Sequence, residues 1–138
     1  MTYHSEIFVR FGYCDPAGIV FYPRYLEMFN NLVEDWCREA QLPFLELQDG
    51  HGCGFPTAHL EVDFLAPSYM GDTLTASLTV RKIGGSSLTL GILLSGPDSA
   101  ARVRGTVVLV LTDMQSKRPF QIPDDVRSRI SAYCEDAS

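Results

Sequence analysis

Hydrophobic and polar residues alternate along five segments of the chain, which is the pattern of strands that bury one face. In segment 73–83, for example, Leu74 and Leu78 share one face with other apolar residues, and polar residues stand between them. The five segments are residues 5–12, 57–66, 73–83, 86–95 and 102–113. Gly84 and Gly85 join two of these segments and are a strong signal of a hairpin. Short connections among the last four segments predict an antiparallel sheet.

A longer period, of three to four residues, marks two further segments as helices. Residues 23–40 carry a broad apolar stripe, and Pro23 suits a first helical turn because its absent N–H has no intrahelical partner to lose. Residues 124–134 begin with acidic side chains, which favour a helix N-terminus, and residues 44–47 form a possible short helix. The broad stripe of the long helix needs a large concave partner, and only strands remain to supply one. We therefore expect an α+β fold in which a five-stranded antiparallel sheet wraps around one long central helix.

Length, charge and hydropathy narrow the classes of function. A chain of 138 residues, 46% hydrophobic and 20% charged, fits a single globular domain over residues 1–138. Its net charge of -6 opposes binding to nucleic acid. The longest apolar runs, such as residues 107–111, are far shorter than the ~20 residues of a membrane-spanning helix. The first residues lack the basic and apolar regions of a signal peptide. We expect a cytoplasmic protein that binds neither nucleic acid nor a membrane.

The spacing of the cysteines predicts no metal site, and the glycine-rich loop predicts no nucleotide site. The four cysteines, Cys14, Cys37, Cys53 and Cys134, include no C-x-x-C pair, so we interpret them as reduced thiols. The glycine-rich loop at residues 51–56 lacks the residue order of a phosphate-binding loop. We therefore expect activity without a metal ion or another cofactor.

The most distinctive segment joins a turn to the start of the long helix. Residues 15–18 (Asp-Pro-Ala-Gly) fit a type I turn, and the helix begins close after Tyr22. The unpaired N–H groups of a helix N-terminus form an anion site, and Asp15, seven residues before Tyr22, can converge on it. Acyl transfer needs both a group that attacks or activates water and donors that stabilise the oxyanion. On the residues alone, the alternative that Asp15 only opens the turn is favoured.

Residues 15–25 (DPAGIVFYPRY) closely resemble the active-site segment of hotdog-fold acyl-CoA thioesterases of the 4-hydroxybenzoyl-CoA thioesterase family. Looser matches follow at residues 62–67 (VDFLAP), 71–74 (GDTL) and 84–88 (GGSSL), so the resemblance covers nearly the whole chain. It implies a hotdog fold and an enzyme that hydrolyses an acyl-CoA to a carboxylate and free CoA. An aromatic acyl-CoA such as 4-hydroxybenzoyl-CoA is a candidate substrate.

The resemblance also implies roles for individual residues. Asp15 matches the catalytic carboxylate, which either attacks the thioester carbonyl or activates water on it. Tyr22 matches the position whose backbone N–H polarises that carbonyl. Gly18 matches a glycine that keeps the backbone near the substrate uncluttered.

Active sites of the resembled family lie between subunits. This makes Tyr25, Gly54 and Thr57 candidates for lining the acyl pocket rather than for chemistry. We expect a homodimer, or a homotetramer built from two dimers, also because a lone five-stranded sheet leaves unpaired edges.

Two departures from the family bear on the substrate. One hairpin is basic in an aryl-CoA member, where it contacts the CoA phosphates, whereas residues 84–86 read Gly-Gly-Ser here. Arg81 and Lys82 flank this hairpin and are the candidates for replacing that contact. Relatives often carry an acidic residue where this chain has Asn30. The identity of the acyl group therefore stays open.

Two other functions stay open for a hotdog domain. It can bind an acyl-CoA without catalysis, as a sensor or carrier, although a sensor normally needs an output domain. It can also be a hydratase or dehydratase, whose chemistry needs a base near the α-carbon of the substrate, commonly a histidine. His4, His51 and His59 all lie outside the Asp15 segment, which favours a thioesterase.

Overall fold

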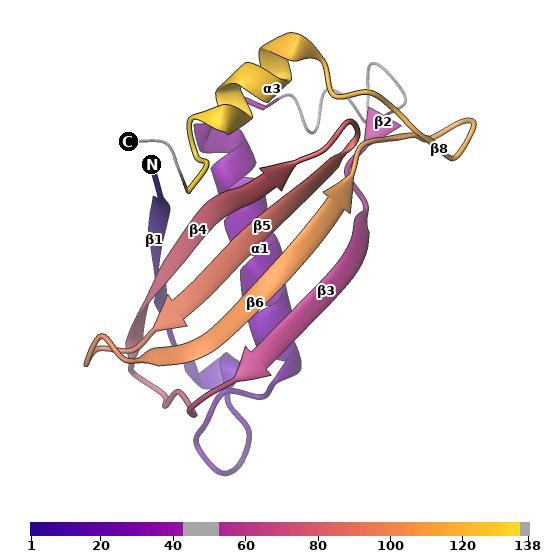
Figure 1. Cartoon of the computed structure of the whole chain (residues 1–138). Coiled ribbons are helices and arrows are strands. Elements are labelled where there is room, and N and C mark those ends of the chain that lie inside the picture. The colour runs from indigo at the N-terminus through magenta and orange to yellow at the C-terminus, as the bar shows by residue number, and fades with distance from the viewer. Residues whose placement is uncertain (43–52, 136–138) are drawn as a thin grey trace.

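The computed structural model describes residues 1–42 and 53–135, and its main elements follow the predicted order (Figure 1). The elements are β1 (Tyr3–Phe8), the 3-10 helix η1 (Phe11–Tyr13), α1 (Pro23–Glu39), β2 (Cys53–Gly54), β3 (Thr57–Phe64), β4 (Thr73–Ile83), β5 (Ser87–Ser95), β6 (Ala101–Val110), β7 (Thr112–Asp113), β8 (Arg118–Pro119) and α3 (Asp124–Ser131). The predicted short helix at residues 44–47 lies outside the described residues. No helix in the described part of the chain is long and apolar enough to cross a membrane.

Five strands form one antiparallel sheet in the order β1-β4-β5-β6-β3, and this sheet curves around α1 (Figure 1). β4 and β5 make the hairpin that Gly84 and Gly85 predict, with Ile83 opposite Leu88. A small second sheet joins β2, β7 and β8. The predicted α+β architecture, a five-stranded antiparallel sheet around one long helix, is therefore confirmed.

The first and the last predicted strand each end at least three residues before the sequence pattern indicates. The first ends at Phe8, because residues 11–13 form a 3-10 helix on the way to the next turn. The last ends at Val110, and Thr112–Asp113 leave the main sheet to pair with β2. The Thr112 hydroxyl donates a hydrogen bond to the Val110 carbonyl at 3.0 Å where the chain changes sheets. The alternation of apolar and polar residues shows which face of a strand is buried, but not which strand it pairs with. The pattern therefore predicts neither the end of β1 nor the end of β6.

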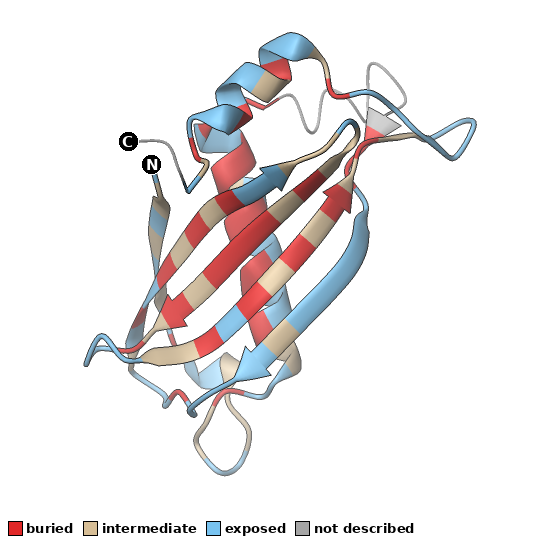
Figure 2. Cartoon of the chain, in the orientation of Figure 1, coloured by how far each residue is buried: buried red, intermediate tan, exposed pale blue. Residues whose placement is uncertain are grey.

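The core lies between α1 and the inward face of the sheet (Figure 2). Trp36 of α1 and Leu78 and Leu90 of the central strands are fully buried. Burying one large apolar side chain contributes roughly 1.5–3 kcal/mol, so many such contacts fix α1 on the sheet. Gly105 of β6 permits a close approach, because a Cβ atom there would overlap the buried ring of Phe29.

β3 forms one edge of the sheet and is exposed along most of its length (Figure 2). Among the described residues it pairs with β6 alone, so its outer edge presents unpaired backbone groups. Leu60 and Phe64 on this strand are 41% and 52% exposed. A free edge that also exposes large apolar side chains is a surface that proteins normally cover.

Candidate active site at the start of the central helix

The Asp15 turn is the tip of a small hairpin that leads into α1. Cys14 and Val20 form a β-bridge, and beyond it the Asp15 N–H donates to the Ile19 carbonyl at 2.9 Å. The Gly18 N–H donates to the Asp15 carbonyl, also at 2.9 Å, and this is the hydrogen bond of the predicted turn. Gly18 has a φ of 81°, which other residues adopt only with strain, so the hairpin needs a glycine here.

Asp15 is a partly buried residue, and its own turn orients its carboxylate. Its Oδ1 accepts a hydrogen bond from the Ala17 N–H at 2.9 Å. Within residues 1–42 and 53–135, no ion pair and no second side-chain hydrogen bond involves Asp15. The turn-forming role and a chemical role are therefore compatible, because Oδ1 holds the turn while Oδ2 stays available.

The backbone N–H of Tyr22 stands at the positive end of α1. Pro23 begins the helix and has no N–H, and the N–H groups of Phe21, Arg24 and Tyr25 all donate to backbone carbonyls. The Tyr22 N–H donates no hydrogen bond to any described residue. Because the helix dipole adds positive potential at this point, the Tyr22 N–H is a donor suited to an oxyanion.

The Asp15 hairpin leads directly into the N-terminus of α1, where Tyr22 is the N-cap, and no hydrogen bond joins Asp15 to Tyr22. Ile19, which pairs with Asp15 across the hairpin, is three residues before Tyr22, a chain distance of at most about 10 Å. The fold thus brings the two predicted catalytic groups into one region without direct contact.

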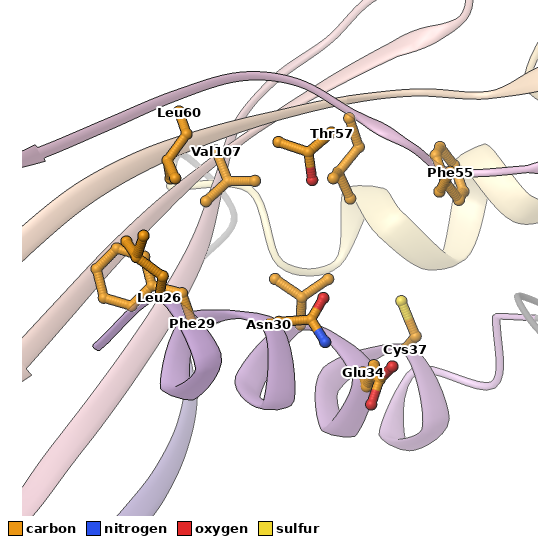
Figure 3. A pocket seen from close by; sticks show the side chains of 11 residues that line it. Leu26, Phe29, Asn30, Glu34, Cys37, Phe55, Thr57, Leu60 and Val107 are labelled. Carbon is orange, nitrogen blue, oxygen red and sulfur yellow. The ribbon is translucent and has the colours of Figure 1, made fainter. Parts of the chain in front are cut away.

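A groove of about 90 Å³ runs along α1, between this helix and the strands β3 and β6 (Figure 3). Most of its lining is apolar: Leu26, Phe29, Val33, Cys37, Phe55, Leu60, Val107 and Leu109. Asn30, Glu34 and Thr57 are its polar residues, and Figure 3 shows Asn30 and Glu34 on successive turns of α1. An apolar cleft with a few polar side chains is typical of a site for a small organic group.

Cys37 is a lining residue of this groove and not a nucleophile. Burial of the thiol, together with the negative charge of Glu34, raises the pKa of Cys37 to about 12. A thiol with this pKa is almost entirely protonated near neutral pH, and only the thiolate attacks. Asp15 therefore stays the candidate for the attacking group.

The three residues that were expected to line the acyl pocket have different surroundings. Thr57 lines the groove directly, and Gly54 is buried in β2 next to the groove residue Phe55. Tyr25 is buried outside the lining of the groove, with its ring centroid 5.8 Å from that of Phe64. Phe64 was not among the predicted pocket residues, and the available signal was a large aromatic residue directly after Asp63 at the end of this strand.

Arg81 and Lys82 lie at the end of β4, away from the groove. The Arg81 guanidinium donates to the Thr106 hydroxyl at 2.9 Å and pairs with Glu135 at 3.5 Å. Thr106 alternates with residues of β6 that face α1, so this contact lies on the opposite face of the sheet. Within one chain, the structure therefore does not bring Arg81 to the start of α1.

Arg127 of α3 is a basic residue at the β4–β5 hairpin that the sequence analysis missed. Its guanidinium donates to the Gly84 carbonyl at 2.8 Å and to the Gly85 carbonyl at 3.4 Å. Arg127 is 43 residues from Gly84 in the chain, so no local pattern reveals the contact. The fold thus supplies a cation at a hairpin whose own sequence contains none.

A family model and a known enzyme are similar to this chain along most of its length. The model of the Thioesterase-like superfamily matches residues 9–130. A 1,4-dihydroxy-2-naphthoyl-CoA hydrolase from Synechocystis sp. is 25% identical over 125 residues, which cover 88% of this chain and 89% of the relative.

Two solved structures share the fold. A 1,4-dihydroxy-2-naphthoyl-CoA thioesterase from Synechocystis superposes with a TM-score of 0.88 at 21% identity, over 95% of this chain and 96% of its own. A gentisyl-coenzyme A thioesterase superposes with a TM-score of 0.80 at 27% identity, over 94% of this chain and 99% of its own. Both similarities therefore extend over nearly all of the fold.

Proposed function

Because the chain belongs to the Thioesterase-like superfamily, we propose that it is an acyl-CoA thioesterase that acts on an aromatic acyl-CoA. The family match and a relative named as a CoA-thioester hydrolase confirm the predicted family and enzyme class. One observation carries the proposal at the site: the Tyr22 N–H, which has no partner among the described residues, stands beside the Asp15 hairpin. Thioester hydrolysis requires such a donor together with a carboxylate.

In the proposed reaction the thioester oxygen accepts a hydrogen bond from the Tyr22 N–H. Asp15 either adds to the carbonyl carbon, giving an anhydride that water then opens, or takes a proton from the attacking water. The carbonyl oxygen becomes negative in both routes, and the N–H and the helix dipole stabilise that charge. Collapse of the tetrahedral intermediate expels the CoA thiolate. In the first route it leaves the anhydride, which water then opens to the carboxylate and free Asp15; in the second it leaves the product acid directly, and the proton held by Asp15 passes to the thiolate. Gly18 leaves open space beside the turn, since a Cβ atom there would meet no neighbour within 4 Å.

The groove beside α1 supports an aromatic acyl group. Its walls are apolar, and Asn30, Glu34 and Thr57 offer polar contacts for ring substituents such as hydroxyls. A relative is named for 1,4-dihydroxy-2-naphthoyl-CoA, an aromatic thioester with two hydroxyls. Glu34, one helical turn after Asn30, gives this groove a carboxylate although position 30 has none.

The described histidines favour a thioesterase over a hydratase or dehydratase. The His4 ring lies 3.2 Å from the Ser77 hydroxyl, and the His59 ring lies 3.1 Å from the Glu61 carboxylate. Both contacts are made on strands of the sheet and not at the Asp15 hairpin. His51 lies outside the described residues.

Thiol release from a panel of aryl and aliphatic acyl-CoA thioesters tests the proposed function. We expect the fastest turnover with hydroxylated aryl-CoA substrates, because the groove combines apolar walls with a few polar groups. Tight binding of an acyl-CoA without thiol release would identify a non-catalytic binder. A preference for aliphatic thioesters would contradict the aromatic substrate and leave the thioesterase activity standing.

Tyr22→Phe should lower turnover far less than Asp15→Asn, because the proposed contact comes from the backbone N–H that the substitution keeps. The ring at this position also keeps its edge contacts with Phe21 and Phe64, at centroid distances of 5.6 and 6.2 Å. Measuring kcat of both variants on the best panel substrate checks this. Comparable losses would mean that the tyrosine hydroxyl takes part in the chemistry.

We also propose that two copies of the chain pair through β3. The outer edge of β3, with Leu60 and Phe64 exposed, borders the groove, so a second copy would cover this edge and enclose the acyl group. A homodimer, or a homotetramer of two such dimers, is the expected assembly. Sedimentation should therefore give at least twice the 15.3 kDa mass of one chain. A stable monomer with full activity would contradict this expectation.

A further inference from the structure

The loop between β3 and β4 gives the Asp15 hairpin a second support. Its segment 68–70 runs beside residues 18–20, which form the strand that returns from the turn. The contacts are the Ile19–Tyr69 β-bridge, a hydrogen bond from the Val20 N–H to the Ser68 carbonyl at 2.9 Å, and one from the Met70 N–H to the Gly18 carbonyl at 3.3 Å. The return strand is therefore paired on both sides, and the position of the turn depends on the position of segment 68–70.

One carboxylate and one guanidinium hold segment 68–70 in place. Asp72 Oδ2 accepts hydrogen bonds from the Tyr69 N–H at 2.9 Å and from the Arg102 guanidinium at 3.2 Å. The same guanidinium nitrogen donates to the Pro67 carbonyl at 2.9 Å. The side chains of Arg102 and Asp72 are only 12% and 21% exposed, so water screens their attraction less than it screens a surface pair.

We propose that Asp72 is a positioning residue for Asp15, acting through the backbone of segment 68–70. This inference rests on the proposed function of Asp15. The Asp72 carboxylate accepts hydrogen bonds from the Tyr69 N–H and from the part-buried guanidinium of Arg102. Tyr69 itself forms a β-bridge with Ile19, on the strand that returns from the Asp15 turn. A misplacement of about 1 Å in a catalytic arrangement lowers the rate by about 100-fold. Even a small shift of segment 68–70 should therefore move Asp15 enough to lower kcat.

Asp98 offers a matched control for Asp72. It also pairs with Arg102, at 3.5 Å, but it belongs to the turn between β5 and β6 and its side chain is 64% exposed. A hydrogen bond from the Ala100 N–H, together with the charge of Arg102, lowers the pKa of Asp98, so this carboxylate is charged at neutral pH. Asp98→Ala therefore removes a negative charge from the same guanidinium and leaves the contacts of segment 68–70 intact.

The test compares kcat and KM for thiol release by Asp72→Ala, Asp72→Asn and Asp98→Ala. We expect Asp72→Ala to lower kcat by about tenfold or more, with a smaller change in KM, because other residues line the groove. Asp72→Asn should have a kcat much closer to that of the wild type, since its amide oxygen can still accept the Tyr69 N–H hydrogen bond. Asp98→Ala should stay near the wild type. An unchanged kcat in Asp72→Ala, or an equal loss in Asp98→Ala, would overturn the inference.

A double-mutant cycle separates positioning from a general loss of stability. If Asp72 acts through Asp15, Asp72→Ala should cost little in an Asp15→Asn background, whereas a full additive loss there would refute the inference. Should Asp72→Ala fail to fold, Arg102→Lys serves instead, and its loss of kcat must also disappear in the Asp15→Asn background. A wild-type protein that hydrolyses no thioester overturns the proposed function and this inference together. An active wild type with a fully active Asp72→Ala overturns the inference alone.

Discussion

Asp15→Asn should lower the turnover of thiol release by at least ~100-fold, the lower end of the loss expected for one acid–base group. The amide keeps the shape of the carboxylate, and its oxygen can still accept the Ala17 hydrogen bond that orients Asp15 at 2.9 Å. The substitution removes the negative charge and with it both the nucleophile and the general base. The melting temperature should barely change, because Asn suits the first position of this turn as well as Asp does. Steady-state kinetics and thermal melts of both proteins give the two readouts.

Asp113→Asn is the matched control for this substitution. Asp113 Oδ1 accepts the N–H of Gln115, two residues later, at 2.9 Å, as Asp15 Oδ1 accepts the N–H of Ala17. Asp113 belongs to β7, which pairs with β2 and β8, and Figure 1 shows those two strands at the opposite end of the sheet from the start of α1. Turnover of the control should match the wild type. Near wild-type turnover of Asp15→Asn itself would reduce Asp15 to a turn former.

Gly105→Ala should lower the free energy of unfolding by about 1–3 kcal/mol, the usual cost of overpacking a core. The added Cβ would overlap the ring of Phe29, which is 2% exposed, and would lie 3.1 Å from the Glu61 carbonyl oxygen. The ring is buried in the core between α1 and the sheet, and the carbonyl belongs to the neighbouring strand β3. Urea denaturation should therefore show a lower midpoint with an unchanged m-value.

Gly91→Ala, one strand away on β5, is the matched control for Gly105→Ala. The three atoms nearest to a Cβ atom at Gly91 would all belong to the guanidinium of Arg81, the end of a flexible side chain that is 40% exposed. That group can move into solvent, so this variant should keep most of the stability of the wild type. Equal stability of the two variants would show that Phe29 can move aside and that this contact does not set the distance between α1 and the sheet.

Local patterns in the sequence were enough to predict α1, α3 and the five strands of the main sheet, but not the small sheet of β2, β7 and β8. The helix predicted over residues 23–40 ends at Glu39, and the predicted turn at residues 15–18 forms with Gly18 at a positive φ. Side chains repeat their direction every 3.6 residues in a helix and every 2 residues in a strand, and this repeat does not depend on what the element packs against. Proline, aspartate and glycine likewise constrain the backbone within a few residues. The segment 15–25 also carried the resemblance that identified the family.

Only the tertiary structure decided which elements meet. β3 follows α1 in the chain, yet it lies at the edge of the sheet beside β6, where it borders the groove. Asp72 and Arg102 are 30 residues apart, and neither stands in a pattern that predicts their contact or the support of the Asp15 hairpin. The sequence by itself therefore determined the elements, the turn and the family, whereas the groove and the support of the hairpin depend on strand order. That order follows from packing of the whole core, because a strand with one apolar face can pair with any other, and local periodicity does not encode its neighbour.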